Sequence, residues 1–181
     1  MLFRSIAAPS STKNAAGARD PEMHQTRKGK DWHFGMKLHI GADRQGLVHS
    51  LTATHAAVAD ITQLPYLLHG RERTLHGDQA YWSEGDRQGW TASGGEYLVN
   101  RRGTRSRPLT GRQRLANRHR SRARARGEHP FQVIKHLWGF TKVRFRGVAK
   151  NLARAYTLFG LANLYRVRKR LLPRGFVPCF A

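Results

Sequence analysis

Strict alternation of apolar and polar residues gives the strongest strand signal in the chain. Over residues 32–40 every second position is apolar, a period of two that is typical of a half-buried β-strand. The polar positions of this segment include His33, Lys37 and His39. Alternation resumes over residues 47–54, after turn-forming residues at 43–46. The pattern predicts a β-hairpin over residues 32–54.

A second strong pattern lies near the C-terminus. Over residues 151–171 apolar side chains recur at helical spacing and make one stripe, which predicts an amphipathic helix. The stripe consists of Ala155, Leu158, Phe159, Ala162 and Tyr165, and Leu161 and Leu164 broaden it. Basic residues in the last turn suit the negative end of the helix dipole. Pro173 and Gly175 are expected to end the helix.

Shorter signals complete the outline. The expected elements are a helix over 62–69 capped by Thr62, strands over 74–77 and 97–99, a helix over 130–138 ended by Gly139, and an extended piece at 143–145. Residues 7–31 read as an irregular basic loop. The segment 101–126 holds eleven arginines and no acid, so a helix there needs counter-charges or a partner to be rigid. This order of elements predicts a mixed α/β layered domain.

The charge balance restricts the kind of partner. The chain has 33 Lys and Arg against 11 Asp and Glu, a formal net charge of +22, and nucleic acid is the commonest polyanion that such a protein meets. The single cysteine, Cys179, indicates a reducing compartment. No apolar run reaches the roughly 18 residues of a membrane span, and no dinucleotide, phosphate-loop or nucleophile-elbow motif is present. We therefore expect a cytoplasmic protein with no membrane partner and no small-molecule substrate.

Acidic residues are rare enough for their positions to be informative. From Tyr97 to the C-terminus the sole carboxylate is Glu128. Asp78 follows a predicted strand, and ligand sites in α/β sheets gather at the carboxyl ends of strands. Each has a simpler interpretation, an ion pair with a neighbouring arginine for Glu128 and a turn or helix cap for Asp78. Brought together, the two carboxylates would suit Mg²⁺ or Mn²⁺.

Two basic residues near Glu128 are further candidates for a functional site. Arg124 and Lys135 lie on the same helical face as Glu128 if the helix continues past Pro130, which removes one backbone hydrogen bond. The ten histidines are scattered and lack the second pair or the cysteines of a structural zinc site. Zinc is therefore not expected.

Several ordered blocks resemble the insertion-sequence five family of bacterial DDE-type transposases. The blocks are residues 8–14, 19–25, 34–37, 59–63, 128–135 and 143–147. The resemblance implies an RNase H-like mixed sheet flanked by helices, and DNA cleavage and strand transfer with Mg²⁺ (or Mn²⁺) held by two aspartates and a glutamate. By motif, Asp78 resembles the second aspartate and Glu128 the glutamate, so both are expected to bind the metal.

The resemblance also assigns supporting residues. Tyr81 follows Asp78 at the family's usual position, and Arg124 and Lys135 match basic positions on either side of Glu128. Ser121 stands where the family has a tyrosine. The residues expected to contact DNA are Arg101, Arg102, Arg118, Arg120, Arg122, Arg124, Lys135, Lys142, Arg144 and Arg146.

The first aspartate of the family has no counterpart. It lies seven residues before the proline of the first block, and Leu2 stands there. We expect three parts: residues 1–31 as a basic loop with the remnant of an incomplete first catalytic strand, 32–171 as the catalytic core with its arginine-rich segment 101–126, and 172–181 as a divergent tail. Loss of one carboxylate predicts an N-terminally truncated transposase with little or no activity alone.

Two other functions fit the composition. The chain could be a non-catalytic DNA-binding fragment that pairs with a full-length transposase and regulates it, which would rest on the arginines rather than on Asp78. It could also be an unrelated basic RNA-binding protein. Salt-sensitive binding of duplex DNA would favour the first, and a preference for structured RNA the second.

Overall fold

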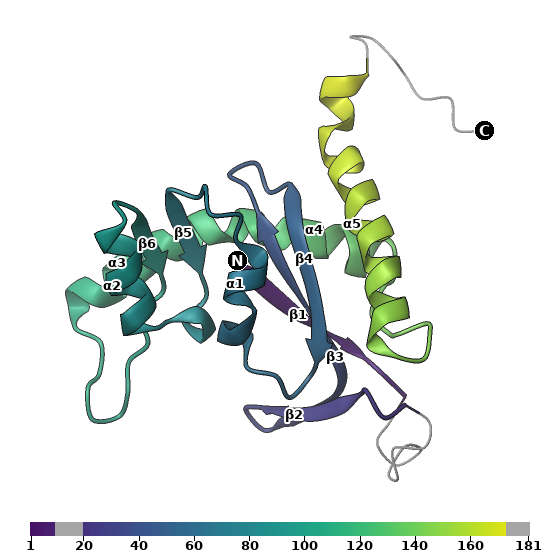
Figure 1. Ribbon diagram of the computed structural model, residues 1–181, viewed down its shortest axis with the longest axis horizontal. Helices are drawn as coiled ribbons and strands as arrows, with labels where there is room; N and C mark the ends of the chain where they lie inside the picture. The colour runs from purple at the N-terminus through teal and green to yellow at the C-terminus, as the bar shows by residue number, and fades with distance from the viewer. Residues whose placement is uncertain (10–19, 173–181) are drawn as a thin grey trace.

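A four-stranded antiparallel sheet built around one long central strand organises the molecule (Figure 1). The computed structural model describes residues 1–9 and 20–172. The strands of the sheet are β1 (Leu2–Ala7), β2 (His24–Lys28), β3 (Asp31–Ala42) and β4 (Val48–His55). β1 pairs with residues 35–40 of β3, while β4 pairs with residues 36–42 and β2 with residues 31–35. The rings of His24 and His55 lie 4.2 Å apart, where β2 and β4 follow one another along β3.

A second, parallel pair of strands lies beside the start of β1. It consists of β5 (Thr74–Gly77) and β6 (Glu96–Val99). The amino group of Met1 donates a hydrogen bond to the carbonyl of His76, so β5 adjoins β1. Across the molecule the strands therefore follow the order β4, β3, β1, β5, β6, and β5 ends close to the beginning of β1.

The helical elements fall into short connections and two long runs. The short ones are η2 (Asp60–Gln63), α1 (Leu64–Leu67), η3 (Gln79–Tyr81) and α2 (Glu84–Ala92). One long run joins α3 (Gly111–Arg124), η4 (Ala125–Gly127), α4 (Glu128–Gln132) and the π-helix η5 (Val133–Leu137). The other is α5 (Val148–Leu171). Among the described residues no helix is long and apolar enough to cross a membrane.

The main core lies between the sheet and the helices α4, η5 and α5. Met36, Leu38 and Ile40 project from β3 into it, and each is at most 1% exposed. They meet Phe131 and Phe159, whose rings pack edge to face with centroids 5.4 Å apart. The opposite face of β3 is covered by η2, α1 and η3, so the central strand is buried on both sides.

The hairpin over 32–54, the strands at 74–77 and 97–99 and the helix over 151–171 are confirmed. The expectation of a loop over residues 7–31 is wrong at β2, which forms a hairpin with β3 through Gly29, whose φ is 65°. β2 has no alternating pattern, because His24, Gln25 and Arg27 are exposed and Thr26 is half-buried. Residues 10–19 lie outside the described part of the chain. Residues 2–7, which we had placed in the loop and strand remnant, form β1.

Some boundaries differ from those expected. The helix over 62–69 is only one turn of 3₁₀-helix followed by α1, with Gln63 rather than Thr62 at the N-cap of α1. In the arginine-rich segment only 111–126 is helical, and Thr110 begins it with a capping box to Gln113. The extended piece at 143–145 is reduced to a bridge between Ala7 and Lys142.

Helix α5 buries a narrower stripe than its sequence indicated. Ala155, Phe159 and Ala162 face the core, whereas Leu161 and Leu164 are 50% and 57% exposed. Leu161 follows Phe159 by two positions, and Leu164 follows Ala162 by two. At this spacing of about 200° around the helix axis, both leucines point away from the core. The expected stop at Pro173 and Gly175 lies outside the described residues, in which the helix ends at Leu171.

Candidate active site

Asp78 stands immediately after β5, where the chain turns into η3. Its Oδ1 accepts a hydrogen bond from the backbone N–H of Gln79 at 2.7 Å, so it caps this single turn of 3₁₀-helix. The backbone carbonyl of Asp78 accepts from the N–H of Tyr81 at 2.9 Å. The side chain is 34% exposed, so Oδ2 remains available for a second partner.

Glu128 comes from the long helical run. The run continues through Pro130, which lies in the first turn of α4, where its missing N–H costs little. Arg124 and Glu128 are therefore one helical turn apart, and Arg124 Nη1 lies 3.3 Å from Glu128 Oε1. The ion pair offered as the simpler interpretation of Glu128 is present, as is the cap offered for Asp78.

The two carboxylates nevertheless converge, because Arg124 also contacts Asp78. Arg124 Nη1 lies 3.7 Å from Asp78 Oδ2 and 3.3 Å from Glu128 Oε1, so these two oxygens are separated by at most about 7 Å. One guanidinium thus occupies the space between residues fifty positions apart in sequence. Its Nε is buried and has no hydrogen-bond partner among the described residues, although the other end of the group is paired.

Leu2 lies against Gly127, the residue before Glu128. It lies in β1 opposite Ile40 and is 2% exposed. A Cβ on Gly127 would approach Leu2 Cδ1 to 2.8 Å, so the strand and the helical run are in close contact at this point. The face of β1 that carries Leu2 also carries Arg4, and Arg4 Nη2 lies 3.2 Å from Glu128 Oε2. Sequence reasoning did not identify Arg4.

The remaining site residues predicted from the sequence lie around this centre in different ways. Lys135 donates to the carbonyl of Ser5 at 3.1 Å and so meets β1 beyond Arg4. Ser121 accepts from Asn100 Nδ2 at 2.9 Å, which ties α3 to the end of β6. Tyr81 is fully buried beneath Asp78. Burial, together with the negative charges of Asp60 and Asp78, raises the pKa of the Tyr81 hydroxyl.

A buried polar cluster supports Tyr81 from the central strand. The Tyr81 hydroxyl lies 3.3 Å from His39 Nδ1, and His39 Nε2 lies 2.9 Å from Thr54 Oγ1. Beside them Lys37 Nζ donates to Asp60 Oδ1 at 3.0 Å. Burial and the adjacent Lys37 lower the pKa of His39 to about 4, so the ring is neutral at pH 7. The hydrophilic positions of β3 were the available signal for this cluster, which we had not assigned a role.

The described side chains at this centre do not make up a complete site for a divalent cation. Within residues 1–9 and 20–172 no group of three His, Cys, Asp or Glu side chains is placed to hold a metal. Asp78 and Glu128 are oxygen ligands of the right kind, but both are paired with guanidinium groups, and the third position is the apolar side chain of Leu2. The residues as arranged do not fit a three-carboxylate metal site.

Seven of the ten cations expected to bind DNA form two exposed groups. Arg101, Arg102, Arg118 and Arg122 are exposed at the α3 end, whereas Lys142, Arg144 and Arg146 lie in the connection before α5, at the other end of the long axis (Figure 1). Arg120 turns inward, where its Nη1 donates to the carbonyl of Val99 at 3.0 Å. Arg124 and Lys135 lie between the two groups, on the helical run.

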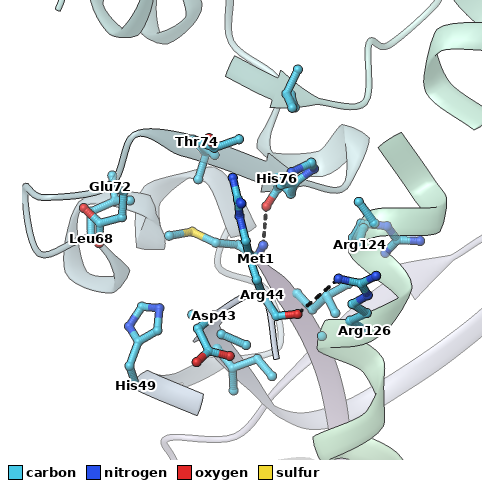
Figure 2. A pocket seen from close by; sticks show the side chains of 18 of the residues that line it. Met1, Asp43, Arg44, His49, Leu68, Glu72, Thr74, His76, Arg124 and Arg126 are labelled. Atoms are coloured by element: carbon cyan, nitrogen blue, oxygen red, sulfur yellow. Dashed lines mark hydrogen bonds between the residues drawn. The ribbon is translucent and has the colours of Figure 1, made fainter. Parts of the chain in front are cut away.

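A cleft of about 570 Å³ opens next to Arg124 (Figure 2). Arg44, Arg73, Arg124 and Arg126 line it together with Asp43, Glu72 and Glu96. Figure 2 shows the side chain of Arg44 extending across the cleft, and Arg126 donates to the carbonyl of Arg44 at 3.4 Å. The cleft shares Leu2 and Arg124 with the carboxylate site, so the two are continuous.

Comparison with known proteins identifies the family of the chain. The family model described as "Transposase DDE domain" matches residues 5–164, a range that contains Asp78, Arg124 and Glu128. No solved structure matches the chain. The family model covers most of the mixed α/β structure, from within β1 to within α5. The chain belongs to the family of transposases that carry a DDE domain.

Proposed function

We propose that the chain is an insertion-sequence five type transposase domain that binds DNA but cuts it poorly by itself, because Leu2 stands in place of the first metal-binding aspartate. The DDE domain indicates DNA cleavage and transfer in transposition. The strand order β4, β3, β1, β5, β6 supports an RNase H-like core. In such a core Asp78 and Glu128 would be the two remaining ligands of Mg²⁺ or Mn²⁺.

The observation that carries the proposal is the convergence of Asp78, Glu128 and Leu2. Asp78 follows β5, Glu128 lies on the helical run and Leu2 lies on β1. Arg124 contacts both carboxylates, and Gly127 lies against Leu2. Leu and Asp have the same branched shape, so Leu2 fills the position of a carboxylate without its charge. Mg²⁺ is normally bound by one or two carboxylates with water and substrate phosphates, but the two-ion arrangement of phosphodiester cleavage needs a shared set of ligands.

A nicking assay on supercoiled plasmid with Mg²⁺ or Mn²⁺ tests the proposal. The wild-type chain is expected to nick at or near background, and Leu2→Asp to gain metal-dependent nicking of at least about tenfold. Leu2→Asn has the same shape without the charge and is the matched control. Adding Asp78→Ala or Glu128→Ala to Leu2→Asp should abolish the gain.

A second test measures the melting temperature, which does not depend on catalysis. A carboxylate at the buried position of Leu2 is costly unless a cation neutralises it, so Leu2→Asp should lower the melting temperature in EDTA and regain it with Mn²⁺. Folded Leu2→Asp protein that neither nicks nor responds to Mn²⁺ would refute the assignment of this site.

The second candidate, a DNA-binding fragment that regulates a full-length transposase, is favoured by the pairing of both carboxylates with arginines. Contacts to six to ten phosphates would weaken binding by roughly 10³–10⁵-fold between 50 and 200 mM salt. Replacement of Arg118 and Arg122 by Ala should reduce that salt dependence. Inhibition of a full-length transposase by the wild-type chain would support this role, and a preference for structured RNA would instead indicate an RNA-binding protein.

A further inference from the structure

Glu128 is neutralised by two arginines rather than one. Arg124 Nη1 contacts its Oε1 at 3.3 Å and Arg4 Nη2 contacts its Oε2 at 3.2 Å. Both carboxylate oxygens are therefore engaged by guanidinium groups that come from different elements, α3 and β1. With Asp78 on the far side of Arg124, the site holds two negative and two positive side chains in contact.

Arg4 is held in this position by more than its charge. Its Nη1 donates to the carbonyl of Phe3 at 3.1 Å, and its guanidinium carbon lies 5.9 Å from the centre of the Phe131 ring. The side chain is 34% exposed, and the carbonyl of the next residue, Ser5, accepts a hydrogen bond from Lys135. Arg4 is thus fixed against the helical run at the same level as Glu128.

The Arg4 guanidinium would repel a metal ion bound to Glu128. Oxygen to Mg²⁺ distances are about 2.1 Å, so a divalent ion bound by Glu128 Oε2 would lie within about 5 Å of the Arg4 guanidinium. Arg124 is shared between Glu128 and Asp78, and its Nε has no hydrogen-bond partner among the described residues. Arg4 is dedicated to Glu128 among the carboxylates of the site, and its contacts with the Phe3 carbonyl and the Phe131 ring hold its charge beside Glu128 Oε2.

We propose that Arg4 is a specificity-determining residue that acts as an internal counter-ion of Glu128 and makes the carboxylate site discriminate against divalent cations. The site keeps its geometry without metal because Arg4 and Arg124 supply the positive charge. Leu2 in place of a carboxylate and Arg4 two residues later therefore both weaken the binding of a divalent cation. This inference rests on the proposed function, which supplies the identity of the metal site.

The test measures Mn²⁺ binding by electron paramagnetic resonance, with no DNA and no turnover. Leu2→Asp is compared with Leu2→Asp/Arg4→Met, because methionine retains much of the apolar stem of Arg4. Removing one positive charge at this distance should tighten Mn²⁺ binding by at least about tenfold even with the dielectric constant of water. Leu2→Asp/Arg4→Lys retains the charge and should bind Mn²⁺ as weakly as Leu2→Asp.

A matched control separates the local effect from net charge. Arg87 pairs with Glu84 at the surface of α2, away from the site, so adding Arg87→Met to Leu2→Asp removes the same charge and should leave Mn²⁺ affinity within about twofold. Equal Mn²⁺ affinity in Leu2→Asp with and without Arg4→Met, or no binding to either at millimolar Mn²⁺, would overturn the role of Arg4. A change in melting temperature alone would assign Arg4 a structural role only.

The two proposals fail differently. If Asp78 and Glu128 do not form the metal site, Leu2→Asp/Arg4→Met binds Mn²⁺ equally well with and without Asp78→Ala. If only the inference about Arg4 is wrong, metal-dependent nicking by Leu2→Asp is intact while the Arg4 substitution changes nothing.

Discussion

Two clusters of opposite charges lie close to β1 and β3 and differ in their access to solvent. In one, Lys37 and Asp60 are each 9% exposed at their side chains and lie beside the fully buried His39. In the other, Arg4 and Glu128 are 34% and 33% exposed. In both clusters a carboxylate lies about 3 Å from a basic side chain. The presence of an ion pair therefore does not show whether a cluster stabilises the fold or binds a ligand.

The difference in burial decides what each cluster can do. Charges removed from water depend on each other and on their hydrogen bonds, since neither partner can be left alone without a large cost. Half-exposed charges exchange partners with water, ions or phosphates at little cost. The buried cluster therefore fixes Tyr81 beneath Asp78, and the half-exposed one is where a ligand can enter.

The sharpest test of this contrast is Asp60→Asn, which leaves the Lys37 ammonium buried without its carboxylate. Removing one partner of a buried pair should cost about 3–5 kcal/mol of unfolding free energy, measured by urea denaturation at pH 7. The double variant Lys37→Met/Asp60→Leu should recover much of that loss because no lone charge remains. A cost below about 1 kcal/mol for Asp60→Asn would mean that the two clusters are energetically alike.

Acidification should act on the buried cluster through His39. Its pKa is lowered to about 4 in the folded protein, so between about pH 6.5 and pH 4 the unfolded chain binds a proton that the folded chain does not. Stability from this group is complete above pH 6.5 and falls by about 3 kcal/mol as the pH drops to 4. The wild type should lose that much more than His39→Gln in urea titrations across this range. Parallel losses in both proteins would contradict the assignment.

The smallest effect is expected at the half-exposed cluster. Glu128→Gln should change the unfolding free energy by no more than about 1 kcal/mol, since surface ion pairs contribute little. Differential scanning calorimetry at low salt provides the measurement. A loss as large as that of Asp60→Asn would show that Glu128 is part of the structural framework, and would weaken its assignment as a ligand.

The sequence predicted those parts of the fold in which local pattern and burial agree. The hairpin over 32–54 places its apolar face in the main core and polar residues such as Lys37 and His39 on the other face, so the alternation is visible in the sequence. β2 has no such face, and it was missed because its pairing with β3 depends on backbone hydrogen bonds that any residue can make. The stripe expected on α5 was too broad because it included Leu161 and Leu164, which lie on the opposite side of the helix from the residues that face the core.

Part of the candidate site could also be predicted from the sequence. Asp78 was recognised by its position after a predicted strand, and Glu128 by the scarcity of acidic residues in the C-terminal half. Arg4 was not, because its role depends on the register of β1 with β3 and on a contact across more than 120 residues. Nor did the sequence indicate that Lys37 and His39 would be buried, since polar residues on a strand usually face water.

The glycine at position 127 sets the distance between the helical run and β1. The missing side chain lets the helical run approach β1 until a Cβ would meet Leu2 Cδ1 at 2.8 Å. Its backbone is ordinary helix, with φ at −70°, so the reason for glycine there is room rather than conformation. The width of this gap sets how far Glu128 stands from the strand, and a bulky residue at position 127 would act as a wedge that moves one carboxylate away from the other without touching either.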